Sequence, residues 1–325
     1  MCIRDSIKGC GVKKALIVTG NSVHNKHKLT ESLIKSLKEH EVEAVVFSEA
    51  KVNPTVEQAE YVARLFIDFS CDGLIGFGGG SAMDLAKAAA CRVSRPDKSF
   101  SSLKGMLKVK KMTVPLFAVP TTAGTGSETT ICAVITDAEN KDKYAINDPV
   151  ITPLATLLDA ELTVSLSPSL TAQTGMDALT HAIEAYVSTA NCDYTDPLAL
   201  HAMEMIKANL VKSYNGDMAA RDSMHNAQCL AGMAFSNALL GIVHSMAHKT
   251  GAAFSTGHIP HGCANAIYLP YVIKYNAKDV VAAKRYAEIA RRMGLAGTSE
   301  QALINSLVEK IDEFNVRLNI PKTLK

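Results

Sequence analysis

The apolar residues of this 325-residue chain follow one pattern before residue 160 and another pattern after it. In the first half, short β-branched runs at residues 15–19, 42–47, 73–77 and 115–119 alternate with amphipathic stretches. The predicted helices between these runs cover residues 28–39, 56–69 and 82–91. Strands that alternate with helices are typical of a parallel sheet covered on both faces. The first half is therefore predicted to be an α/β, doubly wound (Rossmann-like) domain.

Strand signals almost disappear after residue 167. The predicted helices cover residues 168–188, 195–213, 219–238, 241–252, 262–275, 278–293 and 299–317. A run of helices without strands predicts an all-α domain, and a chain of this length is long for a single core. We therefore predict two domains, at residues 1–159 and 160–325.

Composition narrows the class of protein. Apolar residues make up 47% and charged residues 20% of the chain, and a net charge of +2 is spread without a basic stripe, which argues against nucleic acid as a partner. No apolar stretch approaches the ~18 residues of a membrane span. Eight scattered cysteines without a CxxC pair favour reduced thiols, so we expect a cytoplasmic protein. Residues 1–6 match nothing that follows them, and we expect a non-native leader there.

Five residues offer metal-ligand chemistry: Asp177, His181, His244, His248 and His261. The first four form two pairs, each spaced by four residues within a predicted helix, so each pair shares one helical face. A carboxylate with several imidazoles suits Fe²⁺ or Zn²⁺ better than Mg²⁺ or Ca²⁺. A single such pair is more often a surface or capping contact. Here the flanking residues are apolar, and a buried charge must be paired or coordinated; periodicity alone leaves both interpretations open.

Two glycine-rich segments, residues 78–87 and 120–128, each directly follow a predicted strand. Glycines permit close backbone approach, and the N–H groups at the start of a helix attract a pyrophosphate. Asp84 lies in the first turn of the helix that follows the first segment, where it also complements the helix dipole. Either segment alone could be a polar turn. Two of them at consecutive strand ends predict a nucleotide site.

Several segments taken together resemble the iron-containing (group III) alcohol dehydrogenases. They are GGGSAMD (78–84), PTTAGTGSE (120–128), GMDALTHAIE (175–184), GIVHSMAH (241–248) and HIPHGCAN (258–265). The match runs from about residue 12 to the end of the chain, in the family's order and spacing. The resemblance implies a dinucleotide-binding domain at 1–159 and a helical metal-binding domain at 160–325, with metal and nicotinamide in the cleft between them.

The resemblance also assigns residues. It implies that Asp177, His181, His244 and His261 hold the metal. His248 is implied to lie near the nicotinamide as a catalytic residue that relays a proton, although its spacing alone would make it a ligand. His258 is expected beside the ligands rather than among them. The implied cofactor-binding residues are Gly20, Asn53, Gly79, Gly80, Ser81, Asp84, Thr121, Thr122, Thr125, Val134 and Lys143.

The implied reaction is hydride transfer between NAD(P)(H) and a small primary alcohol or aldehyde, with Fe²⁺, or alternatively Zn²⁺, as a Lewis acid. Gly20 stands where many NAD-using members carry an aspartate, so a 2′-phosphate is not repelled and NADP(H) is favoured over NAD(H). A homodimer or larger homo-oligomer is implied, without nucleic acid or membrane. The alternatives are a glycerol-type polyol dehydrogenase, a dehydroquinate synthase-like lyase, and an inactive metal-binding fragment, because both ends look short beside the family.

Overall fold

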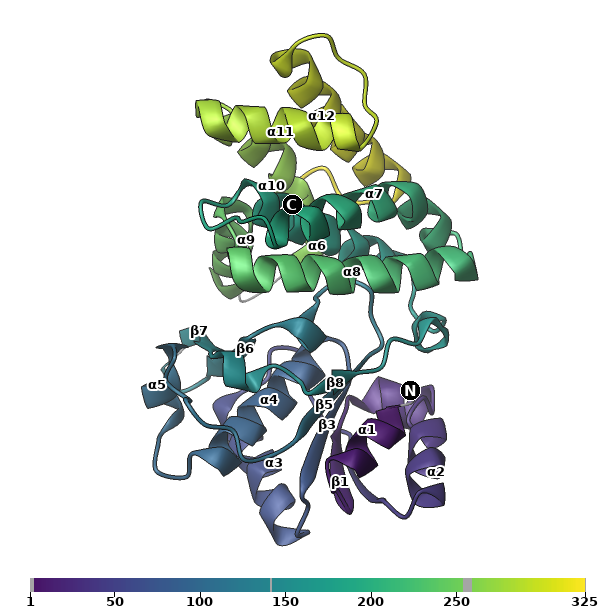
Figure 1. The fold of residues 1–325 in the computed structure, drawn as a ribbon, viewed down its shortest axis with the longest axis vertical. Coiled ribbons are helices and arrows are strands. Elements are labelled where there is room, and N and C mark those ends of the chain that lie inside the picture. The colour runs from purple at the N-terminus through teal and green to yellow at the C-terminus, as the bar shows by residue number, and fades with distance from the viewer. Residues whose placement is uncertain (1–2, 141, 254–258, 325) are drawn as a thin grey trace. The chain divides into compact units, whose positions relative to one another are not determined.

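The computed structural model describes residues 3–140, 142–253 and 259–324. Its contacts divide the chain into two compact units (Figure 1). The first unit holds residues 1–121 and 127–165, and the second holds residues 122–126 and 166–325. The sequence places the division near residue 160, whereas the contacts change from one unit to the other between Ser165 and Leu166. The short segment 122–126 belongs to the helical unit although it lies within the α/β half of the sequence.

A five-stranded sheet forms the centre of the first unit, and its strand order is β2-β1-β3-β5-β8. All of its pairings are parallel. The strands are β1 (Lys14–Val18), β2 (Glu43–Phe47), β3 (Gly73–Gly78), β5 (Leu116–Pro120) and β8 (Ala155–Thr156). Parallel strands end at one edge of a sheet, so the segments that follow β1, β3 and β5 begin at that same edge.

Helices cover both faces of this sheet. They are α1 (Ile3–Gly9), α2 (Glu31–Glu39), α3 (Val56–Asp68) and α4 (Gly80–Ser94), with the short α5 (Phe100–Leu103) and a π-helical turn at Ser22–Lys26. Side chains alternate along a strand: Leu16 and Val18 share a core with α3 and α4, whereas Ala15 and Ile17 share another with α1 and α2. The predicted doubly wound α/β arrangement is confirmed.

Helix α1 includes part of the segment that we expected to be a non-native leader. Its Ile3 and Ile7 are buried in the core beside Leu33 and Leu37 of α2. Residues 3–6 therefore take part in the packing of the first unit, and their non-native origin stays a prediction.

A second, three-stranded sheet was not predicted from the sequence. Its order is β4-β7-β6, with β4 at Gly105–Met106, β6 at Cys132–Asp137 and β7 at Asp142–Asn147. Strands β6 and β7 pair antiparallel, and β6 packs against α4. Alternate residues of the two strands (Ala133, Ile135, Tyr144 and Ile146) are buried in the core, but this short pattern was not recognised as strands. This sheet places Val134 and Lys143 on neighbouring strands.

The second unit is helical, as predicted. Its helices are α6 (Pro168–Val187), α7 (Thr195–Tyr214), α8 (Met218–Ala238), α9 (Ile242–Ala253), α10 (His261–Asn276), α11 (Val280–Arg292) and α12 (Glu300–Arg317). Capping side chains explain several of the starts, because Ser167, Asp217 and Ser299 each accept a hydrogen bond from the backbone N–H three residues later. Helix α6 is packed by α7, α8 and α10, and every residue from Gly175 to Tyr186 is buried.

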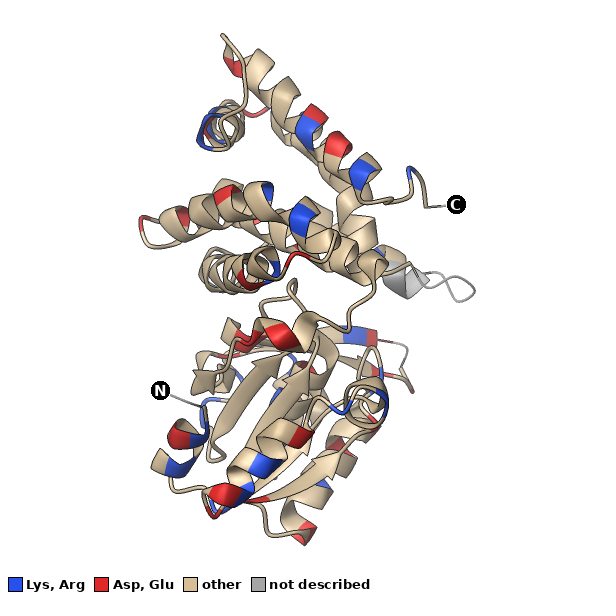
Figure 2. Cartoon of the chain, turned by 90° about the vertical axis from the view of Figure 1, so that its right-hand side faces the viewer, with Lys and Arg blue, Asp and Glu red and all other residues tan. Residues whose placement is uncertain are grey.

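Surface charge is mixed in both units: Lys and Arg are interspersed with Asp and Glu on the helices (Figure 2). Within the described ranges, no single helix has the length and hydropathy to cross a membrane. One pair, Met218–Ala238 with Ile242–Thr250, passes that test only when taken together and is bent by 100° at its break.

Candidate metal centre and nucleotide loops

Helix α6 presents three ionisable side chains on one face. Asp177, His181 and Glu184 follow each other at intervals of four and three residues, which brings them into register along the helix. All three are buried. Because α6 is buried on every side between residues 175 and 186, these polar groups need partners within the protein. Helices α9 and α10 supply those partners.

Three of the five predicted metal-site residues bring their donor atoms together. One donor atom each of Asp177, His244 and His261 lies within 4.8 Å of the others. Asp177 Oδ1 is 3.7 Å from His244 Nε2 and 3.6 Å from His261 Nε2. Asp177 and His244 are buried, whereas the His261 side chain is 37% exposed. One carboxylate with two imidazoles is a donor set that fits a borderline divalent ion such as Fe²⁺ or Zn²⁺.

His181 lies beside this three-donor group. Its ring stacks on the His244 ring with 4.4 Å between centroids, and on Phe235 at 4.3 Å. Its Nδ1 lies 3.2 Å from the carbonyl oxygen of Gly124. A ring that donates from Nδ1 to a carbonyl keeps its Nε2 lone pair for a ligand role. The assignment of His181 as a fourth ligand stays a prediction.

Glu184 was not predicted as a site residue. Its Oε2 lies 2.6 Å from His244 Nδ1, so a buried carboxylate holds the far side of a predicted ligand. The helical interval would have revealed it, because Glu184 lies seven residues after Asp177 on the same apolar helix.

Asn265 was missed as well. It lies four residues after His261 in α10 and is fully buried. Its Nδ2 donates to Asp177 Oδ1 at 2.7 Å and lies 3.1 Å from His244 Nε2 and 3.2 Å from His261 Nε2. Its amide thus contacts all three donors, and no spacing in the sequence indicates this because the three come from three helices.

Burial and two nearby carboxylates shift the pKa values of the buried histidines in the metal centre. Burial lowers the pKa of His181 to about 4, against the opposing effect of Asp177. Burial also disfavours charge on His244, but hydrogen bonds to Asp177 and Glu184 outweigh it and raise the pKa of that ring to about 9. Two carboxylates around His244 therefore favour positive charge at this point in the second unit.

His248 lies on the same helix as His244, one turn later, and is exposed. Its ring centroid is 4.7 Å from that of His261 and 6.3 Å from that of His244. It is not among the three donors that gather around Asp177. His258 lies outside the described residues.

The two glycine-rich segments meet in the first unit. Strand β3 ends at Gly78, whose φ of 151° requires glycine, and α4 begins at Gly80 after an extended Gly79. Thr121 N, at the end of β5, donates to Gly78 O at 3.0 Å. The predicted residues Gly79, Gly80, Ser81 and Thr121 therefore share one edge of the sheet, where the N–H groups of α4 offer an anion site.

Asp84 is hydrogen-bonded to the second glycine-rich segment and to β6. Its Oδ1 accepts from Ser127 Oγ at 2.9 Å and its Oδ2 from Val134 N at 3.2 Å, so Asp84 and Val134 are in direct contact. Burial raises the pKa of Asp84, and the nearby Lys87 ammonium opposes this shift. Lys87 was not predicted to have a role. Its buried Nζ donates to the carbonyls of Ser127, Thr130 and Cys132 and to Thr130 Oγ1, at 2.6 to 2.9 Å.

The remaining cofactor candidates of the first unit lie on other elements. Lys143 Nζ donates to Asn53 Oδ1 at 2.8 Å, and Asn53 adopts a positive φ of 56°. Gly20 follows β1, and a Cβ added there would meet only Ala50 O, at 3.5 Å.

Thr122 and Thr125 belong to the second unit. Their segment is held by close approaches, since a Cβ on Gly124 would lie 2.6 Å from Thr174, and Gly126 N donates to Gln228 Oε1 at 2.7 Å. The buried Thr122 Oγ1 has no hydrogen-bond partner among the described residues, which leaves that hydroxyl free for a ligand.

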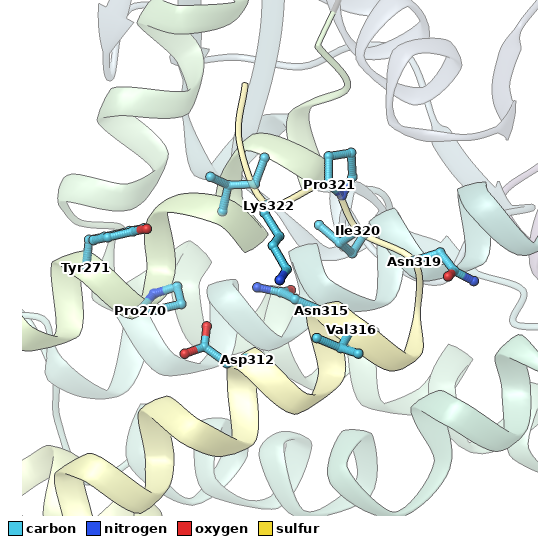
Figure 3. A pocket seen from close by; sticks show the side chains of 10 residues that line it. Pro270, Tyr271, Asp312, Asn315, Val316, Asn319, Ile320, Pro321 and Lys322 are labelled. Atoms are coloured by element: carbon cyan, nitrogen blue, oxygen red, sulfur yellow. The ribbon is translucent and has the colours of Figure 1, made fainter. Parts of the chain in front are cut away.

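A separate hollow of about 620 Å³ lies elsewhere in the second unit. Figure 3 shows its lining, which comes from α10, α12 and residues 319–322 and includes Tyr271, Asp312 and Lys322. No residue of the predicted site lines it.

Comparison with known families and proteins agrees with this geometry. A family model described as iron-containing alcohol dehydrogenase matches residues 2–160, and one described as the C-terminal part of the Fe-containing alcohol dehydrogenase family matches residues 171–325. The first match begins ten residues before the position where the sequence motifs begin to resemble the family.

Individual relatives extend over nearly the whole chain. The NADPH-dependent butanol dehydrogenase of Clostridium saccharobutylicum is 47% identical over 99% of this chain and 82% of its own length. The NAD-dependent methanol dehydrogenase of Bacillus methanolicus is 38% identical over 97% of this chain and 82% of its own. The solved alcohol dehydrogenase of Oenococcus oeni aligns with a TM-score of 0.94 at 35% identity, covering 99% of this chain and 84% of that one. The chain therefore belongs to the iron-containing alcohol dehydrogenases and is an NAD(P)-dependent alcohol oxidoreductase.

Proposed function

We propose that this enzyme transfers hydride between a small primary alcohol or aldehyde and NADP(H), with Fe²⁺ held by Asp177, His181, His244 and His261. The observation that carries the proposal is the group of donor atoms from the buried Asp177 and His244 and the half-buried His261, all within 4.8 Å of one another. When bound, the metal supplies a Lewis acid for the substrate oxygen and the nicotinamide supplies the hydride acceptor or donor. Zn²⁺ is the alternative ion, because the same donors suit both.

The protein's own residues prepare this chemistry in three ways. Asp177 contributes the negative charge of the donor set, and burial keeps His181 neutral and able to act as a ligand. His248 is exposed beside His261, with 4.7 Å between the ring centroids, which supports a role for its imidazole in exchanging the hydroxyl proton of the substrate with solvent. The N–H groups at the start of α4 offer hydrogen bonds to a phosphate of the cofactor.

The preference for NADP(H) rests on Gly20. Without a carboxylate after β1, nothing there repels a 2′-phosphate or holds a ribose 2′-hydroxyl. The names of the relatives differ on this point, since one is NADPH-dependent and the other NAD-dependent. The name of the butanol dehydrogenase supports a short primary alcohol or aldehyde as substrate. The ratio of kcat/KM for NADPH to that for NADH measures the preference, and a strong preference for NADH would overturn it.

Substitution of two histidines tests the assignment of the metal centre. His261→Ala should lose both bound metal and turnover, whereas His248→Gln should retain the metal and lose turnover by about 10²- to 10⁴-fold, the usual contribution of a proton-transfer residue. His201→Ala, on the exposed face of α7, is the matched control and should change neither. Each protein is depleted of metal, reconstituted with Fe²⁺ or Zn²⁺, and assayed on a panel of aldehydes with NADPH and NADH. Full activity of His261→Ala after chelation would refute the proposal.

We also propose a cytoplasmic enzyme that works as a homodimer or larger homo-oligomer. The free state of the seven described cysteines supports the reducing compartment. Light scattering on the purified protein tests the assembly, and a monomeric mass at assay concentration would contradict it.

A further inference from the structure

We propose that Glu184 is a positioning residue for the metal centre: it holds His244 so that Nε2 faces the other donors, and metal affinity depends on this contact. The inference rests on the metal site of the proposed function. It concerns a residue that provides none of the predicted ligand atoms and acts through one that does.

The contact between the two side chains is short and buried. Glu184 Oε2 lies 2.6 Å from His244 Nδ1, and both side chains are less than 5% exposed. A carboxylate at this distance keeps a proton on Nδ1. When the ring is neutral, as a metal ligand must be, its lone pair is then on Nε2, the atom that lies 3.7 Å from Asp177 Oδ1.

Glu184 also holds the backbone that carries His244. Its carboxylate accepts from the N–H groups of Gly241 at 3.0 Å, Val243 at 2.7 Å and His244 at 3.4 Å. These groups lie at the start of α9, where the N–H groups have no partner within the helix. One carboxylate therefore determines both the position of the helix start and the rotation of the ring.

Gly241 makes this approach possible. A Cβ at this position would lie 2.9 Å from Glu184 Oε1, closer than real Cβ contacts allow. A residue with a Cβ at this position would displace the carboxylate from the start of α9, so the glycine leaves room for the contact.

The two buried imidazoles of the site differ in the group that contacts their Nδ1 atom. His181 Nδ1 faces a neutral carbonyl at 3.2 Å, whereas His244 Nδ1 faces a charged carboxylate at 2.6 Å. A carboxylate behind a ligating imidazole fixes the ring and strengthens its donation to the metal. Glu184 is not placed as a ligand itself, because its two oxygens receive four N–H donors and contact the side of the ring opposite Nε2.

A purely structural role for Glu184 makes a different prediction. If the carboxylate only caps α9, its loss lowers the stability of the metal-free protein and leaves the metal affinity of the folded protein unchanged. If it positions His244, its loss weakens metal binding even in protein that is fully folded. Metal affinity measured without turnover separates the two roles.

The test is Zn²⁺ competition against a chromophoric chelator, on metal-depleted proteins whose helix content is checked by circular dichroism. Glu184→Gln should bind Zn²⁺ about 10- to 100-fold more weakly than the wild type, the usual effect of removing such a partner. Gly241→Ala, which leaves the glutamate in place but displaces it, should weaken binding in the same direction even if Glu184→Gln does not fold. The matched control is Asp196→Asn, which removes a carboxylate paired with Arg285 in the same unit and should leave Zn²⁺ affinity unchanged.

A double substitution tests whether Glu184 acts on metal binding through His244. In a His244→Ala background, Glu184→Gln should change Zn²⁺ affinity by less than about twofold, because the residue through which it acts is gone. Wild-type affinity in both folded Glu184→Gln and Gly241→Ala, or an undiminished effect of Glu184→Gln without His244, would overturn the inference alone. Failure of the wild-type protein to bind Zn²⁺ or Fe²⁺ would overturn the proposed function and this inference together.

Discussion

Gly262→Ala tests the packing that brings two metal donors together. Gly262 lies in the first turn of α10, directly after His261, and α10 packs against α6. A Cβ at this position would lie 2.1 Å from the carbonyl oxygen of Gln173 and 3.2 Å from the Cβ of Asp177. Because real Cβ contacts essentially never fall below 3.0 Å, the start of α10 must move from α6 by at least about 0.9 Å.

The displacement has two expected costs. Overpacking of this kind typically destabilises by about 1–3 kcal/mol, which lowers the Tm of a unit of this size by roughly 2–12 °C. A metal site tolerates errors of only about 0.2 Å in its ligand distances. A shift of His261 that is several times larger should therefore weaken metal binding in protein that is still folded.

Scanning calorimetry on the metal-free protein and Zn²⁺ competition measure the two effects. Gly9→Ala is the matched control, because the same methyl there meets no atom within 4 Å. If Gly262→Ala melts within about 1 °C of the wild type, which is less than the decrease expected from overpacking, and binds Zn²⁺ with wild-type affinity, the contact between α10 and α6 does not hold the donors as described.

Three further substitutions test other contacts. Lys87→Met leaves three carbonyls and Asp84 without the buried ammonium, so urea unfolding should show a loss of about 3–5 kcal/mol; less than 1 kcal/mol would contradict the role of Lys87. Asn265→Leu removes the donor to Asp177 Oδ1 and should lower Tm more in metal-free than in Zn²⁺-saturated protein; equal losses would refute this. Gly20→Asp, but not Gly20→Asn, should shift the kcat/KM ratio about tenfold towards NADH, since a side chain there meets only Ala50 O; equal shifts would exclude charge as the cause.

Local signals account for the part of the fold that the sequence predicts well. The starts of α6, α8 and α12 lie within about a residue of their predicted positions, because their capping side chains are adjacent in sequence. Strands β1, β3 and β5 are short, apolar and buried, so their runs stand out. The sheet of β4, β6 and β7 was missed although alternate residues of β6 and β7 are buried, because the apolar pattern is short and the pairing depends on the rest of the unit.

The nucleotide loops, too, were predicted only in part from the sequence. The two glycine-rich segments were recognised from composition and from their position after strands. The contacts that attach them were not recognised, because Lys87 reaches carbonyls 40 to 45 residues away and segment 122–126 belongs to the helical unit. Contacts between residues so far apart leave no periodic pattern in the sequence.

By itself, the sequence determined that Asp177 and His181 share one face of a buried helix and that His244 and His248 share another, because the helical period places residues four apart in line. Although the family resemblance implied His244 and not His248, spacing alone did not decide which of these histidines meets Asp177. That followed from α9 and α10 packing against α6, which gathers the donors of Asp177, His244 and His261 and leaves His248 exposed. Close approach at Gly241 and Gly262 permits this packing. The helical interval places Glu184 on the face of Asp177, but the contacts that Glu184 and Asn265 make on other helices appeared only in the tertiary structure.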